Sequence, residues 1–138
     1  MSGQEEDLDE LIQFASELAD TARGLILPHV RRAVSIDYKD DATPVTEVDR
    51  AVEQAMRERI AARYPRHGIV GEEFDDVRPD GVPTWVLDPI DGTKAFVTGR
   101  PLFGTLIGLV VDGRPIIGVL DVPVLAERWV GASGRVTR

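Results

Sequence analysis

Cysteine is absent from this 138-residue sequence. Its absence excludes disulfide bonds, thiolate zinc sites, iron–sulfur clusters and a cysteine nucleophile. The composition is therefore compatible with a reducing compartment such as the cytosol. The two histidines, His29 and His67, are isolated and lack metal-ligand spacing to any partner, so we expect structural or surface roles for both.

Basic residues and long apolar runs are also scarce. The chain has 16 Lys and Arg against 24 Asp and Glu, which gives a net charge of −8. Such a chain lacks the basic face that nucleic-acid backbones require, although bound metal ions would let it hold an anionic ligand. The N-terminus is unlike a signal peptide, and no apolar run is long enough to span a bilayer. We therefore expect a cytoplasmic protein that binds neither nucleic acid nor membrane.

Two helices are predicted in the first half of the chain. Apolar residues recur at spacings of three and four along residues 8–26, which predicts an amphipathic helix ending near Pro28. Residues 35–45 are polar and contain a proline, so we expect a loop. A second amphipathic helix is predicted to begin at Thr46 and to end at Tyr64-Pro65.

Strands dominate the remainder. Their expected positions are residues 69–70, 85–87, 103–111, 116–120 and 128–130. Residues 112–115 (Asp-Gly-Arg-Pro) are expected to form a hairpin turn. Helices followed by strands predict an α+β fold in which the two helices pack on one face of a mostly antiparallel sheet. Residues 131–138 have turn-like composition and close no domain, so we expect the sequence to be part of a longer protein.

Two carboxylates, Asp88 and Asp91, lie three residues apart at the end of an apolar strand. Pro89 fixes its own φ and lacks an N–H, so we expect the chain to turn after Asp88. That turn aims both carboxylates and the Ile90 carbonyl at one point, where Mg²⁺ would find the oxygen ligands it prefers.

Gly92 and Thr93 follow at once. Gly92 lets the backbone approach a phosphate closely, and Thr93 begins a short predicted helix over residues 93–97, whose N-terminus favours an anion. The structural alternative is a strand-to-helix turn in which Asp91 is an N-cap. The complete string of residues 88–93 favours the metal and phosphate site.

Three further acidic residues, Glu72, Glu73 and Asp49, are candidates for the metal site or for positioning its neighbours. Glu72 and Glu73 follow a predicted strand and offer a metal ligand and an outer partner, the alternative being an acidic surface loop. Thr46 and Asp49 have capping-box spacing, and a capped Asp49 would also orient Thr93. Lys39 is either part of a mobile lid over the site or a solvated surface lysine.

Three segments carry a resemblance to a known family. They are residues 45–49 (Val-Thr-Glu-Val-Asp), 71–73 (Gly-Glu-Glu) and 85–93 (Trp-Val-Leu-Asp-Pro-Ile-Asp-Gly-Thr). In this order and spacing they resemble the inositol monophosphatase family of Mg²⁺-dependent phosphomonoesterases. Residues 94–106 most resemble its bacterial histidinol-phosphate phosphatases. The resemblance implies the N-terminal half of a layered αβαβα sugar-phosphatase fold.

The resemblance also implies a role for each motif residue. Metal ligands would be the Glu72, Asp88 and Asp91 carboxylates and the Ile90 carbonyl, with Asp88 bridging two Mg²⁺ ions for which Mn²⁺ could substitute. Thr93, held by Asp49, would orient the attacking water beside Glu72, so that these three are the catalytic residues. Asp91, Gly92 and Thr93 would bind the substrate phosphate. Glu73 and Lys39 would occupy outer or lid positions.

The length departs from the family pattern. Family members are roughly twice as long, as their two-part architecture requires, and a Trp-Asp motif in their second half completes the metal site. Residues 1–138 would therefore form the N-terminal metal- and phosphate-binding domain, with the C-terminal domain absent.

The resemblance implies a phosphoric monoester hydrolase. Its substrate would be a small phosphorylated metabolite, with L-histidinol phosphate, from histidine biosynthesis, as the first choice. The alternatives are myo-inositol 1-phosphate and a truncated, inactive metal-binding fragment whose exposed sheet face would self-associate. Homodimerisation is also expected from the family.

Overall fold

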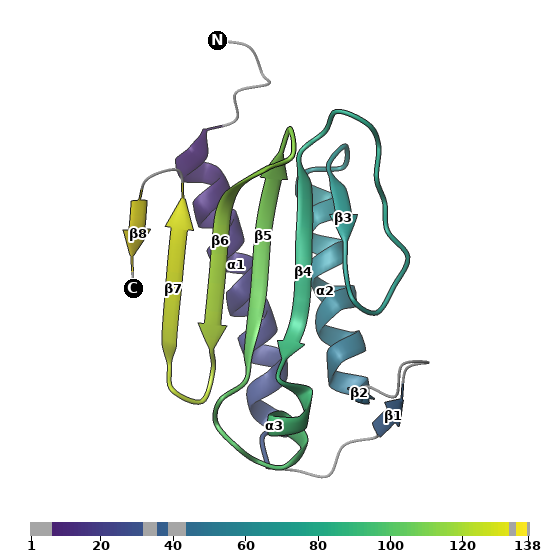
Figure 1. The fold of residues 1–138 in the computed structure, drawn as a ribbon, viewed down its shortest axis with the longest axis vertical. Helices are drawn as coiled ribbons and strands as arrows, with labels where there is room; N and C mark the ends of the chain where they lie inside the picture. Colours follow the sequence, from purple (N-terminus) through teal and green to yellow (C-terminus); the bar gives the residue numbers. More distant parts are fainter. Residues whose placement is uncertain (1–6, 32–35, 39–43, 133–134, 138) are drawn as a thin grey trace.

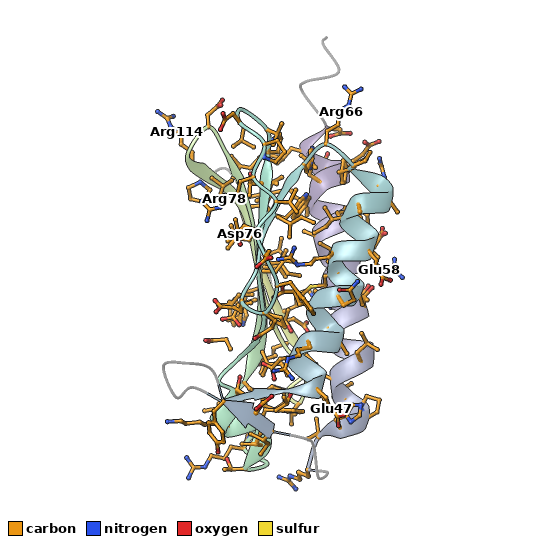
Figure 2. The ribbon with its side chains drawn as sticks, turned by 90° about the vertical axis from the view of Figure 1, so that its right-hand side faces the viewer. Glu47, Glu58, Arg66, Asp76, Arg78 and Arg114 are labelled. Carbon is orange, nitrogen blue, oxygen red and sulfur yellow. The ribbon has the colours of Figure 1, made fainter. Side chains whose placement is uncertain are left out.

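The computed structural model describes residues 7–31, 36–38, 44–132 and 135–137. Their main feature is a mixed sheet with helices α1 (Leu8–Ile26) and α2 (Glu47–Arg63) packed side by side on one face (Figure 1). The edge-on view in Figure 2 places both helices on the same side of the sheet. This arrangement confirms the predicted α+β fold. No helix in the described ranges has both the length and the apolar character needed to cross a membrane.

The helices begin and end where the sequence predicts. In α1 the Asp7 side chain caps the first turn by accepting a hydrogen bond from the Asp9 N–H at 3.0 Å. A short 3-10 helix, η1 (Leu27–His29), continues from α1 and contains Pro28. In α2 Thr46 is the N-cap of a complete capping box, and Tyr64 ends the helix. Both helices bury an apolar stripe against the sheet, as their periodicity indicates.

The described residues form one large sheet with the strand order β3-β4-β5-β6-β7-β8. Only the pair β3–β4 is parallel among these strands, and the other neighbouring pairs are antiparallel. The strands are β3 (Gly68–Val70), β4 (Thr84–Asp91), β5 (Gly104–Val111), β6 (Arg114–Val122), β7 (Glu127–Ala132) and β8 (Arg135–Thr137).

Two expectations about loops were wrong, and the expected hairpin turn is confirmed with shorter bounds. Part of the predicted loop over 35–45 is strand, since β1 (Ile36–Tyr38) pairs antiparallel with β2 (Pro44–Thr46). The hairpin turn needs only Asp112 and Gly113, at φ +52° and +75°, because two residues with positive φ match the twist of the strands. The turn-like residues 131–138 include the end of β7 and all of β8, which pairs with β7.

Aromatic side chains fill the core between α1, the end of α2 and the sheet. Trp85 on β4 is fully buried, and its indole N–H donates to Nδ1 of His67 at 3.0 Å. The His67 ring stacks on Tyr64, with 4.6 Å between ring centroids, and Phe14 meets Trp85 edge-on. These contacts confirm a structural role for His67.

Asp121 links α1 to the far strands. It is fully buried on β6 and accepts hydrogen bonds from Nε and Nη2 of Arg23 on α1 and from Nε of Arg128 on β7. Arg128 also reaches back to α1, donating to the Ser16 carbonyl at 3.2 Å and pairing with Asp20 at 2.7 Å. Burial alone would lower the pKa of Arg128, but its hydrogen bonds to Asp20 and Asp121 raise that pKa above the ordinary value.

We predict that Asp121→Ala lowers the free energy of unfolding by about 3 kcal/mol, because it leaves two guanidinium groups partly buried without their shared carboxylate. Urea unfolding followed by Trp fluorescence measures the change. The matched control is Asp76→Ala, which removes the exposed Asp76–Arg78 pair seen in Figure 2 and is expected to change stability by less than about 1 kcal/mol. Equal losses in the two variants would contradict the role given to Asp121.

Candidate functional site

Two predicted metal ligands line one groove near the end of β3, where this strand runs parallel to β4. The register pairs Val70, the last residue of β3, with Val86 of β4. Glu72 therefore lies two residues beyond the end of β3, and Asp88 lies two residues further along β4, which runs in the same direction. Both side chains line one open groove of about 570 Å³. The parallel register therefore brings together two carboxylates that are 16 positions apart in the sequence.

The expected turn after Asp88 is instead a bulge. Asp88 pairs with Leu106 and Asp91 with Gly104, so β4 uses one more residue than β5 between these pairs. Pro89 fits in a bulge because it cannot donate to the ladder, and its carbonyl accepts a hydrogen bond from the buried Thr105 hydroxyl at 2.8 Å. Strand β4 therefore continues to Asp91, whose side chain is exposed.

Gly92 redirects the chain from β4 into helix α3 (Thr93–Val97), as the sequence predicts. It has φ +89° and ψ 42°, a left-handed conformation that favours glycine. A Cβ at this position would lie 3.2 Å from the Leu102 carbonyl. The N-cap of α3 is Gly92, which has no side chain to cap the helix. The alternative in which Asp91 is the N-cap was therefore wrong.

Asp49 and Thr93 are in contact, as the sequence predicts. The Thr93 hydroxyl lies 3.2 Å from Oδ1 of Asp49 and 3.1 Å from the Ile90 carbonyl oxygen. Oδ2 of the same carboxylate accepts hydrogen bonds from the backbone N–H and the hydroxyl of Thr46. Asp49 is 2% exposed, so the capping box holds a buried carboxylate against the start of α3. The catalytic role of this pair stays a prediction.

Glu53 was missed by the sequence analysis. It is fully buried on α2, and its carboxylate accepts hydrogen bonds from the backbone N–H groups of Glu72, Glu73 and Phe74. One sequence signal was available. Glu53 comes four residues after Asp49 and directly after the apolar Val52, so it lies on the face of α2 that the helix buries.

The other predicted site residues are Glu73, Ile90 and Lys39. Glu73 is half-buried on the segment after β3, and the Ile90 side chain is buried. Lys39 lies outside the described residues. Across the described ranges, no three Asp, Glu, His or Cys side chains are gathered tightly enough to hold a metal ion. The donors along the groove and at the end of β4 are nonetheless carboxylate and carbonyl oxygens, which is the chemistry that Mg²⁺ requires.

Comparison with known proteins gives several relatives. The bifunctional phosphatase IMPL2, chloroplastic, of Arabidopsis thaliana is 45% identical over 96% of this chain and 39% of its own length. The histidinol-phosphatase of Chlorobaculum parvum is 42% identical over 89% of this chain and 48% of its own length. The histidinol-phosphatase of Mycobacterium tuberculosis is 47% identical over 72% of this chain and 38% of its own length.

Solved structures agree with this fold. An inositol monophosphatase from Zymomonas mobilis has 46% identity and a TM-score of 0.80, with 96% of this chain and 51% of that chain covered. A Thermotoga maritima IMPase has 30% identity and a TM-score of 0.85 over 94% of this chain and 51% of its own. The chain spans about half the length of the curated relatives it matches. The family model matches residues 7–137, and the chain belongs to the inositol monophosphatase family.

Proposed function

We propose that this chain is the metal- and phosphate-binding part of a Mg²⁺-dependent phosphatase that hydrolyses L-histidinol phosphate to L-histidinol and phosphate. The observation that carries the proposal is the contact between Thr93 and Asp49 just after β4, the strand that also carries Asp88, which lines one groove with Glu72. It supports the proposal because a hydroxyl held by a buried carboxylate contacts the Ile90 carbonyl oxygen, and oxygen donors are the ligands that divalent ions such as Mg²⁺ prefer.

In this proposal Glu72, Asp88, Asp91 and the Ile90 carbonyl hold Mg²⁺, and Mn²⁺ can take its place. When bound, the ions supply Lewis-acid chemistry, which neutralises phosphoryl charge and lowers the pKa of water. The Thr93 hydroxyl oxygen lies 3.1 Å from the Ile90 carbonyl oxygen, so the expected metal ligand and the expected water-orienting group are neighbours.

Asp49 and Thr93 control the direction of one hydrogen bond. A threonine hydroxyl has one hydrogen to donate and lone pairs that accept. Oδ2 of Asp49 is occupied by Thr46, and Oδ1 faces the Thr93 hydroxyl. When that hydroxyl donates to Oδ1, its lone pairs are free to accept a hydrogen bond from the attacking water. The pair thereby orients the water toward phosphorus.

The phosphate would lie at the start of α3. The first N–H groups of a helix lack intrahelical partners, and the left-handed Gly92 leaves the backbone there without a side chain. Asp91 and Gly92 are both exposed at this point, so a ligand can reach them. The Gly92 and Thr93 amides would donate to phosphoryl oxygens.

L-Histidinol phosphate is the proposed substrate because relatives named histidinol-phosphatase are 42% and 47% identical to this chain. The second candidate is myo-inositol 1-phosphate, favoured by the 46% identity to the Zymomonas mobilis inositol monophosphatase. Metal binding without turnover is the third, and the exposed groove favours it. Val86, Leu106 and Trp129 in its lining are 41%, 38% and 40% exposed, so the groove does not enclose a substrate.

The first test measures phosphate release from L-histidinol phosphate, myo-inositol 1-phosphate and 3′-phosphoadenosine 5′-phosphate, with Mg²⁺ and with EDTA. We expect release to require Mg²⁺ and to be fastest from L-histidinol phosphate. Asp91→Asn should lower kcat by about 100-fold, because it removes an anionic ligand that acts on the transition state. Preference for the inositol ester would contradict the substrate, full activity of Asp91→Asn would contradict the site, and no release from any ester would favour the non-catalytic alternative.

A second test separates the Thr93 hydroxyl from the shape of its side chain. Thr93→Val keeps the volume but removes the hydrogen bond to Asp49, and we expect kcat to fall by about 100-fold. Thr93→Ser keeps the hydroxyl and should retain most of the activity, with unchanged circular dichroism in both variants. Equal kcat values for the valine and serine variants would show that the hydroxyl does not orient the water.

A further inference from the structure

Glu53 is a fully buried carboxylate to which the proposed chemistry assigns no role. It lies one helical turn after Asp49 on α2, so the same face of the helix carries both acids. Burying a carboxylate is unfavourable unless hydrogen bonds replace its water. The partners of Glu53 therefore identify what this residue stabilises.

Those partners are three consecutive backbone N–H groups. Oε1 accepts from the N–H of Glu72 at 2.8 Å and from that of Glu73 at 2.9 Å. Oε2 accepts from the N–H of Phe74 at 3.1 Å and from Nε of Arg57 at 2.9 Å. A single side chain thus fixes the backbone on which Glu72 is carried.

Arg57, one turn further along α2, binds the carbonyl groups of the same segment. Its Nη1 donates to the Asp75 carbonyl at 2.8 Å and its Nη2 to the Phe74 carbonyl at 3.0 Å. The guanidinium also lies 5.8 Å from the centroid of the Phe74 ring. Glu53 and Arg57 therefore satisfy both donors and acceptors of residues 72–75, a segment that the described strands do not include.

Gly71 permits this close approach. A Cβ at this position would lie 2.4 to 2.6 Å from the carboxylate atoms of Glu53, closer than real Cβ contacts come. The segment therefore lies directly against the acid, with no space for a side chain between them. An alanine here would push the carboxylate away from the amides without changing any charge.

We propose that Glu53 is a positioning residue for the metal site, one that acts by holding the Glu72 backbone so that the Glu72 carboxylate enters the groove it shares with Asp88. This inference rests on the proposed function, because it takes Glu72 as a metal ligand. Glu53 itself contacts backbone N–H groups and Arg57, and its proposed role is to hold a ligand rather than to be one. Arg57 contributes by keeping the Glu53 carboxylate and the segment's carbonyl groups in place.

The test uses Glu53→Gln, which keeps the size of the side chain but turns an acceptor oxygen into a donor facing N–H groups. Its matched control is Glu58→Gln, the same change at an exposed position of α2 (Figure 2). Calorimetric titration with Mn²⁺ alone gives the metal affinity. We expect Glu53→Gln to raise the Kd about 10- to 100-fold, as for other residues that hold a metal ligand, and Glu58→Gln to leave it unchanged.

Hydrogen exchange without metal provides a second readout. Exchange of the Glu72, Glu73 and Phe74 amides should be faster in Glu53→Gln than in the parent chain, because one acceptor oxygen then remains for N–H groups that two carboxylate oxygens bind in the parent chain. Exchange elsewhere in α2 and in the sheet should stay the same.

Gly71→Ala tests the same contact from the opposite side and remains informative if Glu53→Gln does not fold. It should also weaken Mn²⁺ binding and expose the three amides. Gly24→Ala is its control, because a Cβ on this exposed turn of α1 meets no atom of the described chain within 4 Å. If the parent chain binds Mn²⁺ and the folded Glu53→Gln and Gly71→Ala variants bind it equally well, the positioning role of Glu53 is overturned and the proposed function stands. Absence of Mn²⁺ binding in the parent chain would overturn the proposed function as well.

Discussion

The buried carboxylates of α2 are the constraint on which the site depends. Asp49 is 2% exposed and Glu53 is fully buried, and each must replace its lost water with hydrogen bonds. Asp49 finds Thr46 in its own cap and Thr93 44 residues further along the chain. Glu53 finds the three amides that follow β3. The hydrogen bonds that these two carboxylates require therefore hold the start of α3 and the segment after β3 against α2.

The sheet adds the second constraint. Since β3 and β4 are parallel, the segment that follows β3 continues alongside β4, which brings Glu72 into one groove with Asp88. The bulge at Pro89 then carries β4 on to Asp91, and Gly92 turns the chain into α3. The sequence of β4 alone sets the order of its expected metal ligands. The position of Glu72 beside Asp88 depends instead on the pairing of β3 with β4 and on the hydrogen bonds that Glu53 accepts. Asp121 and its two arginines keep α1 packed on this sheet at its other side.

The sequence predicts the parts of this fold that are periodic or local. Apolar spacing predicts both long helices, and the Gly92-Thr93 pair predicts α3 at its observed bounds. The contact between Asp49 and Thr93 was also expected. Glu53 was missed because a lone glutamate beside an apolar stripe is usually solvated, and only the tertiary fold supplies its amide partners. Strands β1, β2 and β8 were missed because each has only three residues and lacks the adjacent apolar pair, Ile69-Val70, that indicates β3.

A crystal structure of the chain grown with Mn²⁺, with the ion located by its anomalous scattering, tests the central claim most directly. The account predicts Mn²⁺ at ligand distance from the Glu72 and Asp88 carboxylates, with Asp91 beside it, and Glu53 still bound to the amides of residues 72–74. An ion bound elsewhere would contradict the assignment of Glu72 and Asp88 as metal ligands. An ion bound by Glu53 itself would contradict its role as the residue that holds Glu72 in place.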